Sequence, residues 1–248
     1  MSRNTIKKAF IITELPLYFA FLYLDITDRL PQTAAVFKYI SILICAVMAI
    51  YEGAINLIDY KNKRSKDFLP GGLIALGLIF TAVSDRFLLF EEDILPGLVS
   101  FCVVQTIYLI AIIGPDIRKC VVLFIVRWGL GILGMIFLTG VAPDQRVLIV
   151  IVLFYGISFV GNIFHLLKEN VSKRISQKCI FARPALFLTG MILFLMCDIN
   201  VLIFNLRDYL SIESQSFDTF EKLASVLIWT FYLPAQVMIV SSARKIED

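Results

Sequence analysis

The chain contains almost no histidine: His165 is the only one among its 248 residues. A single imidazole excludes zinc sites built from several histidines, and no H-E-x-x-H segment is present. No G-x-S-x-G segment is present either, which excludes most Ser-His-Asp hydrolases unless His165 is the base. The five cysteines are odd in number and lie in or beside apolar segments, which is typical of small buried side chains and not of a disulfide framework.

Charged residues are also scarce, at 17% of the chain, and the net charge of +3 is too small to indicate a nucleic-acid partner. Hydrophobic residues make up 59% of the sequence. A soluble domain is about 45–50% apolar, so this composition predicts a polytopic membrane protein of the all-α class. The apolar segments follow one another with short connections, which predicts a single transmembrane domain over residues 1–248.

About 20 apolar residues span the hydrocarbon layer of a bilayer, and on this basis the chain divides into eight transmembrane helices. The predicted helices cover residues 9–25, 33–58, 70–90, 94–113, 120–140, 146–167, 184–205 and 219–241. The start imitates a signal peptide, with Lys7 and Lys8 before an apolar run. No A-x-A-like cleavage site follows, so we expect a retained first helix.

Basic residues favour the cytoplasmic side of a membrane. With eight helices, every connection rich in lysine and arginine falls on one side, and the opposite connections hold only Arg29, Arg146 and Arg207. Both termini are therefore predicted to be cytoplasmic. The membrane would be the cell or inner membrane in a bacterium and the endoplasmic reticulum in a eukaryote.

Two aspartates lie inside predicted spans, Asp85 in T-A-V-S-D-R-F-L-L-F and Asp198 in L-F-L-M-C-D-I-N-V-L-I-F. A charge at that depth costs about 2.5–3.5 kcal/mol, so such residues generally have a function. Each segment precedes a helix with a glutamine, Gln105 or Gln236, a pattern compatible with a four-plus-four internal repeat and equally with chance. Asp85 also lies beside Arg86, so a snorkelling ion pair at the interface is an alternative.

Several polar residues are predicted to lie at similar depths in the membrane. Helix rise places Asp85 about 22 Å from the cytoplasmic start of its helix, with Asp198 at a similar height. Lys38 reaches the same half of the membrane, and Gln105 and Tyr108 lie one turn apart near the middle of the fourth helix. We expect these five residues to line a cavity between the second, third, fourth and seventh helices.

A second polar group lies in the predicted cytoplasmic half and consists of Glu14, Glu52, Arg127 and His165. The expected role of Arg127 is structural, as the cation of a buried ion pair with Glu14 or Glu52.

The fourth predicted helix reads Gly97-x-x-x-Phe101-x-x-x-Gln105-x-x-Tyr108. This resembles the G-x-x-x-F-x-x-x-H-x-x-Y of the YhhN family of membrane proteins, the lysoplasmalogenase family. Gln105 stands where that family has histidine. Because a glutamine cannot shuttle a proton as histidine can, this departure leaves the level of activity open.

Further segments carry the resemblance along most of the chain. The family's G-D-x-x-L is resembled by residues 84–88, where Ser84 replaces the glycine. Its S-D-x-x-L is resembled by residues 197–202, where Cys197 replaces the serine and the leucine comes one place late. The family's aromatic pair before A-Q is resembled by residues 231–236, and Lys38 can match an early lysine of the second helix.

The resemblance implies hydrolysis of the vinyl-ether bond of a lysoplasmalogen to a fatty aldehyde and a glycerophospho-ethanolamine or -choline. Asp85 and Asp198 would be the catalytic pair, with no metal or organic cofactor. Protonation of the terminal vinyl carbon gives an oxocarbenium ion, a task suited to two carboxyl groups with different roles. The more apolar flanks of Asp198 favour it as the acid, and Asp85 would be the ionised partner.

The remaining expected site residues are substrate-binding. Gln105 and Tyr108 would hold the water or an ether oxygen, and Lys38 would meet the lipid phosphate. Tyr232 and Gln236 complete the set through the family's aromatic and A-Q motif.

Two other readings stay open. A non-enzymatic lipid-binding or transport protein could have the same polar cavity, and the loss of the family histidine at Gln105 favours it. Intramembrane aspartyl proteolysis also uses two helix-borne aspartates, but its Y-D and G-x-G-D signatures are absent. The expected partners are a lysophospholipid and the lipid bilayer, and the sequence carries no signal for an oligomeric state.

Overall fold

The computed structural model describes residues 3–61, 69–91, 93–114, 116–138, 145–172, 183–210 and 215–243. Within these ranges it contains eight α-helices, each long and apolar enough to cross a membrane. The helices are α1 (Arg3–Ile26), α2 (Pro31–Lys61), α3 (Leu69–Arg86), α4 (Ile94–Ile113), α5 (Ile117–Leu138), α6 (Arg146–Ser172), α7 (Pro184–Leu210) and α8 (Gln215–Ser241). The all-α class and the eight predicted spans are confirmed.

Two helices differ from the prediction in ways that matter for the site. Helix α1 begins at Arg3, well before residue 9, and continues through Pro16. Lys7 is accommodated inside it because its ammonium pairs with Glu52 at 3.3 Å. After α3 the chain continues as a π-helix, η1 (Phe87–Glu91), directly beyond Asp85. Short π segments are frequently found at functional sites.

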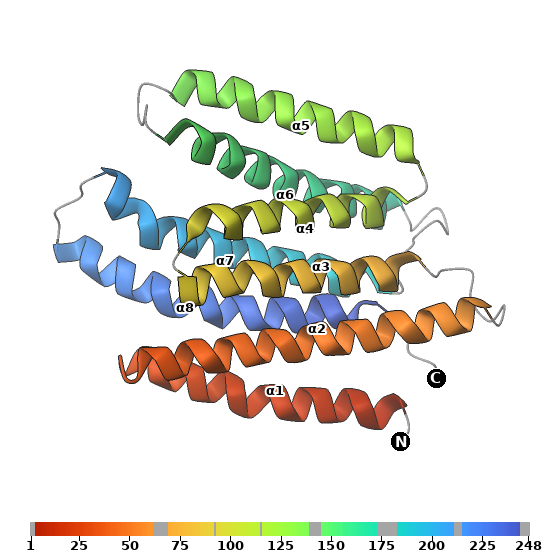
Figure 1. Cartoon of the computed structure of the whole chain (residues 1–248), viewed down its shortest axis with the longest axis horizontal. Helices are drawn as coiled ribbons and strands as arrows, with labels where there is room; N and C mark the ends of the chain where they lie inside the picture. The colour runs from red at the N-terminus through yellow and green to blue at the C-terminus, as the bar shows by residue number, and fades with distance from the viewer. Residues whose placement is uncertain are drawn as a thin grey trace.

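Successive helices run in opposite directions, so α1 begins and α8 ends at the same end of the bundle (Figure 1). We call this the terminal end and the opposite one the distal end. In α3 and α7, residues with higher numbers lie nearer the distal end. In α4, α6 and α8, residues with higher numbers lie nearer the terminal end. The compartment that each end faces stays a prediction.

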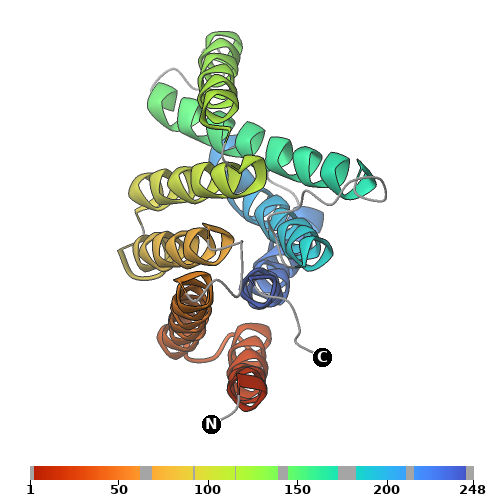
Figure 2. The same ribbon diagram turned by 90° about the vertical axis from the view of Figure 1, so that its right-hand side faces the viewer.

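Six helices form a closed ring, in which α2 contacts α3, α3 contacts α4, and so on through α6, α7 and α8 back to α2 (Figure 2). Helix α1 lies outside the ring against α2 and α8, and α5 lies outside it against α6 and α4. The centre of the ring is filled by one cluster of buried side chains. Polar groups inside that cluster are shielded from lipid and must find partners among the ring helices.

Helices α3 and α4 are held in register by two close contacts. The Ser84 hydroxyl donates to the Gly97 carbonyl at 2.6 Å. Nearer the terminal end, Gly77 lies against the Tyr108 ring: a Cβ added at Gly77 would come within 2.5 Å of Tyr108 Cε1. The motif residues Ser84 and Gly97 thus set the position of Asp85 relative to α4.

We expect Gly77→Ala to destabilise the protein by about 1–3 kcal/mol, because the Tyr108 ring is fully buried and cannot move aside without displacing its neighbours. Gly72→Ala is the matched control in the same helix, since a Cβ there meets nothing within 4 Å. Thermal unfolding in detergent measures both variants. Equal melting temperatures for the two would contradict the close packing of α3 on α4.

Candidate active site

Asp85 is buried on α3, with 3% of its surface exposed. The Tyr232 hydroxyl, from α8, donates to both of its carboxyl oxygens, at 2.9 Å to Oδ1 and 2.8 Å to Oδ2. Arg86 turns away from this pair: its Nε bonds to Glu91 at 3.2 Å on the exposed face. The alternative of a snorkelling Asp85–Arg86 pair is therefore wrong, because the adjacent side chains of a helix point in different directions.

Asp198, on α7, has a different environment. Its Oδ2 accepts a hydrogen bond from the Tyr155 hydroxyl of α6 at 2.7 Å. The Asp198 side chain is half-buried. Tyr155 was not among the predicted site residues. Each aspartate thus has one tyrosine partner, and the partners come from α6 and α8, which the expected four-helix cavity did not include.

One aromatic cluster joins the two pairs. The Phe194 ring contacts Tyr232 with a centroid distance of 5.3 Å, and it contacts Phe101 at 5.6 Å. Phe101 in turn contacts Tyr155 at 5.9 Å. The buried Cys197 thiol lies within electrostatic range of both Asp85 and Asp198. The two aspartate–tyrosine pairs therefore border one aromatic cluster in the distal half of the ring.

Lys38 of α2 approaches the same site. Its ammonium pairs with Asp25 of α1 at 2.8 Å and lies 5.0 Å from the centre of the Trp229 ring. Trp229 contacts Tyr232 edge-on, with a centroid distance of 5.0 Å. Contacts of Trp229 and Tyr232 therefore connect Lys38 to Asp85. Asp25 is a partner of Lys38 that the sequence pattern did not reveal.

The other three predicted binding residues lie nearer the terminal end of the ring than the aspartates do. Gln105, Tyr108 and Gln236 are all completely buried, one to two turns nearer the terminal end than the aspartates. The Asn162 amide of α6 donates to Gln105 twice, to its side-chain oxygen at 3.0 Å and its backbone oxygen at 2.9 Å. The predicted residues therefore occupy two layers of the ring instead of one cavity.

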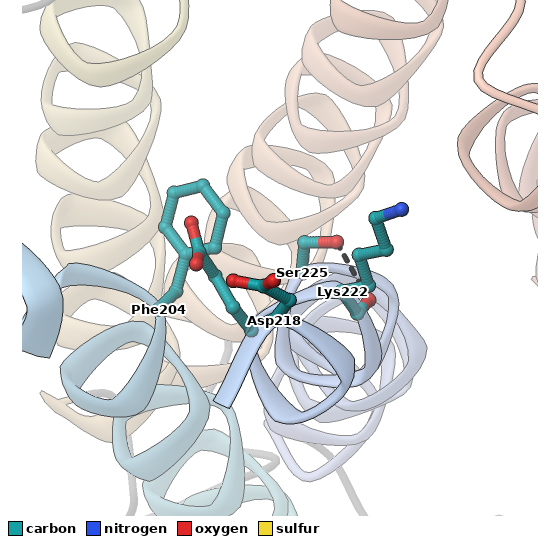
Figure 3. Close-up of a pocket in the computed structure, with 5 residues that line it drawn as sticks. Phe204, Asp218, Lys222 and Ser225 are labelled. Atoms are coloured by element: carbon teal, nitrogen blue, oxygen red, sulfur yellow. Dashed lines mark hydrogen bonds between the residues drawn. The ribbon is translucent and has the colours of Figure 1, made fainter. Parts of the chain in front are cut away.

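A pocket of about 420 Å³ opens at the distal ends of α7 and α8 (Figure 3). It is lined by Phe204, Asp218, Glu221, Lys222 and Ser225. The ammonium of Lys222 points away from Phe204 and Asp218 (Figure 3). Because Ser225 precedes Trp229 by one helical turn, the pocket lies on the distal side of the Lys38–Trp229 contact.

This arrangement supplies two carboxyl groups, two phenols and an aromatic wall. A pair of carboxyl groups in different environments can divide the roles of proton donor and cation stabiliser. Aromatic faces also stabilise a nearby positive charge. Among the described residues no three His, Cys, Asp or Glu side chains gather as metal ligands.

The predicted ion pair of Arg127 with Glu14 or Glu52 is wrong. Glu14 accepts a hydrogen bond from the Cys45 thiol at 3.6 Å, and Glu52 pairs with Lys7. Arg127 lies on α5, which contacts α4 and α6 but neither α1 nor α2 in the described part of the chain. Depth alone suggested the pairing, but the ring places these helices on opposite sides.

We expect Arg127→Met to leave the stability unchanged or slightly higher, since Arg127 Nη2 is buried with no hydrogen-bond partner among the described residues. Lys7→Met serves as the contrast: it removes the partner of the buried Glu52 and should cost about 1–3 kcal/mol. The melting temperatures of both variants in detergent measure these effects on stability. A loss for Arg127→Met as large as that for Lys7→Met would show that Arg127 has an ion-pair partner after all.

Comparison with known proteins assigns the chain to a family. No curated protein and no solved structure matches it. The family model of the YhhN family matches residues 33–243, which include α2 from residue 33 onward, the other five ring helices in full and both aspartates. The chain therefore belongs to the YhhN family, which includes lysoplasmalogenases.

Proposed function

We propose that this protein is a membrane hydrolase that cleaves the vinyl-ether bond of a lysoplasmalogen. The observation that carries the proposal is the pair of membrane-embedded aspartates, each hydrogen-bonded to a tyrosine and both set against one aromatic cluster. Family membership supports the reaction class. The products would be a fatty aldehyde and glycerophospho-ethanolamine or -choline.

The hydrogen-bond pattern supports different roles for the two aspartates. Tyr155 occupies only one oxygen of Asp198, so the other is available to carry a proton toward substrate. Tyr232 donates to both oxygens of Asp85, an arrangement suited to an ionised carboxylate that only accepts. Asp198 is the more exposed of the two, so the expectation from its apolar flanks that it has the more apolar surroundings is wrong. Its assignment as the acid rests instead on its unoccupied oxygen and on an exposure that suits a group that must reach a lipid.

The reaction then proceeds in three steps. Asp198 protonates the vinyl carbon β to the ether oxygen. The electrons of the C=C bond form the new C–H bond and leave an oxocarbenium ion, which Asp85 and the aromatic cluster stabilise. Water adds to the cationic carbon and gives a proton to Asp85, which forms a hemiacetal. Asp85 then protonates the leaving oxygen while the hemiacetal hydroxyl returns a proton to Asp198, so both carboxyl groups are regenerated.

The distal pocket and Lys38 suggest how the lipid is oriented. The head group would occupy the pocket of Phe204, Asp218 and neighbours, with the phosphate toward the Lys38 ammonium. On α8 the pocket residue Ser225 precedes Tyr232 by seven residues, about 10 Å along the axis. The phosphate and glycerol would bridge this interval and place the vinyl ether at the aspartates.

Purified protein should release aldehyde from lysoplasmalogen and none from the matched acyl lysolipid. Asp85→Asn and Asp198→Asn should each lower kcat by about 10²–10⁴-fold, because each removes a group that acts in the transition state. Aldehyde release is followed with a coupled dehydrogenase assay. Full turnover by Asp198→Asn would contradict its role as the acid.

Lys38→Met should raise KM about tenfold with little change in kcat, since a charged contact to the phosphate is lost. Lys119→Met is the matched control, because Lys119 is exposed on α5, which lies outside the ring, and it is at the terminal end, opposite the pocket. Michaelis constants for both variants are compared after their melting temperatures have been matched. Equal KM values would place the phosphate elsewhere.

A lipid-binding or transport protein is the second candidate. The observation that favours it is Gln105, a neutral amide bonded to Asn162, at the position of the family's histidine. Saturable binding of lysolipid without aldehyde release would support this candidate over the hydrolase.

A further inference from the structure

On the terminal side of the aspartates, the four ring helices α3, α4, α6 and α8 each present a buried polar side chain. Thr81 precedes Asp85 by one turn on α3, and Gln236 follows Tyr232 by one turn on α8. Gln105 follows Phe101 by one turn on α4. Because these helices alternate in direction, all three steps lead the same way, so the residues share one level.

Helix α6 adds two more polar side chains, one at this level and one a further turn toward the terminal end. Ser158 follows Tyr155 by three residues, and Asn162 by seven. We define the inner polar layer as Thr81, Gln105, Tyr108, Ser158, Asn162 and Gln236. None of the six has more than 1% of its surface exposed.

Most polar atoms of this layer lack a partner. Among the described residues, the side chains of this layer form one hydrogen bond with each other, from Asn162 to the Gln105 side-chain oxygen. The atoms without a hydrogen bond are Thr81 Oγ1, Gln105 Nε2, Tyr108 Oη, Ser158 Oγ, Asn162 Oδ1 and both amide atoms of Gln236. Buried polar atoms are almost always hydrogen-bonded, so this concentration on one level indicates a polar molecule bound among them.

The side chains of the layer indicate which kind of molecule binds there. Its side chains are amides and hydroxyls without charge, so they are unsuited to a phosphate or a metal cation. They include donors, such as Gln105 Nε2, and acceptors, such as Asn162 Oδ1. Water both donates and accepts, so it satisfies atoms of both kinds, whereas a lipid chain would leave them unsatisfied.

We propose that the inner polar layer binds the water consumed by the hydrolysis, and that Thr81 and Gln236 position it. This inference rests on the proposed function. Both residues lie one turn from the Asp85–Tyr232 pair, on the side away from the lipid pocket. Water held there attacks the oxocarbenium carbon from the terminal side and passes its proton to Asp85, while substrate enters from the distal side.

The test uses the double variant Thr81→Val/Gln236→Met, which removes the polar atoms with little change of shape. Hydroxyl-radical footprinting by radiolysis reports bound water without any need for turnover. In the unaltered protein the fully buried Tyr108 should be oxidised far faster than the equally buried Phe21, and the double variant should lower this rate several-fold. Oxidation of Tyr108 no faster than that of Phe21 would overturn the water site.

Stability gives a second readout. If the layer were dry, replacing unpartnered polar groups with apolar ones of similar shape would raise the melting temperature. If it holds water, the melting temperature stays the same or falls. A clear rise would therefore also overturn the proposal.

Kinetics test the positioning role. The double variant should lower kcat by about ten- to a hundred-fold with KM nearly unchanged. Asn200→Leu is the control, because this buried amide bonds to the Met196 carbonyl of its own helix at 2.7 Å and should keep normal kcat. An unchanged kcat in the double variant would overturn the positioning role.

The two proposals fail separately. Aldehyde release by a protein whose Tyr108 is protected from radicals would overturn the inner layer alone. Oxidation of Tyr108 in a protein that releases no aldehyde would overturn the hydrolase and leave the water site in place.

Discussion

The structure depends on the hydrogen bonds between two intramembrane carboxyl groups and tyrosine hydroxyls. Asp85 is buried and Asp198 half-buried within membrane-spanning helices, and among the described residues neither forms an ion pair. A polar group in hydrocarbon is costly unless a protein partner satisfies it. Tyr232 links α8 to α3 across the ring, and Tyr155 links the neighbouring helices α6 and α7, so the same bonds that satisfy the aspartates also hold the ring helices together.

The ring is organised in levels along its axis, and α8 shows all of them on one face. From the distal end this face presents the pocket residue Ser225, then Trp229 beside Lys38, then Tyr232 on Asp85, and finally Gln236 in the inner polar layer. The spacing of three or four residues keeps these side chains on the same side of the helix. A charged lipid head group, the reacting bond and water would thus each have a separate level.

Hydropathy predicted the eight spans because a bilayer demands long apolar helices, and the cost of a buried charge identified both aspartates. Depth along each helix correctly placed Lys38 near Asp85 in height. It could not give the order of helices around the ring, so Tyr155 was missed and Arg127 was paired with the wrong helices. Which face of a helix meets which neighbour is decided by packing, and the sequence pattern carries little of that information here.

The central claim is that the two aspartate–tyrosine pairs act as one catalytic unit, and a double-mutant cycle tests it most directly. Tyr155→Phe and Tyr232→Phe each remove one hydroxyl and should leave enough activity to measure kcat/KM for aldehyde release. If both pairs serve one transition state, the double variant should lose clearly less than the product of the two single losses. Single losses that simply multiply would contradict the account, since they would show that the pairs act independently.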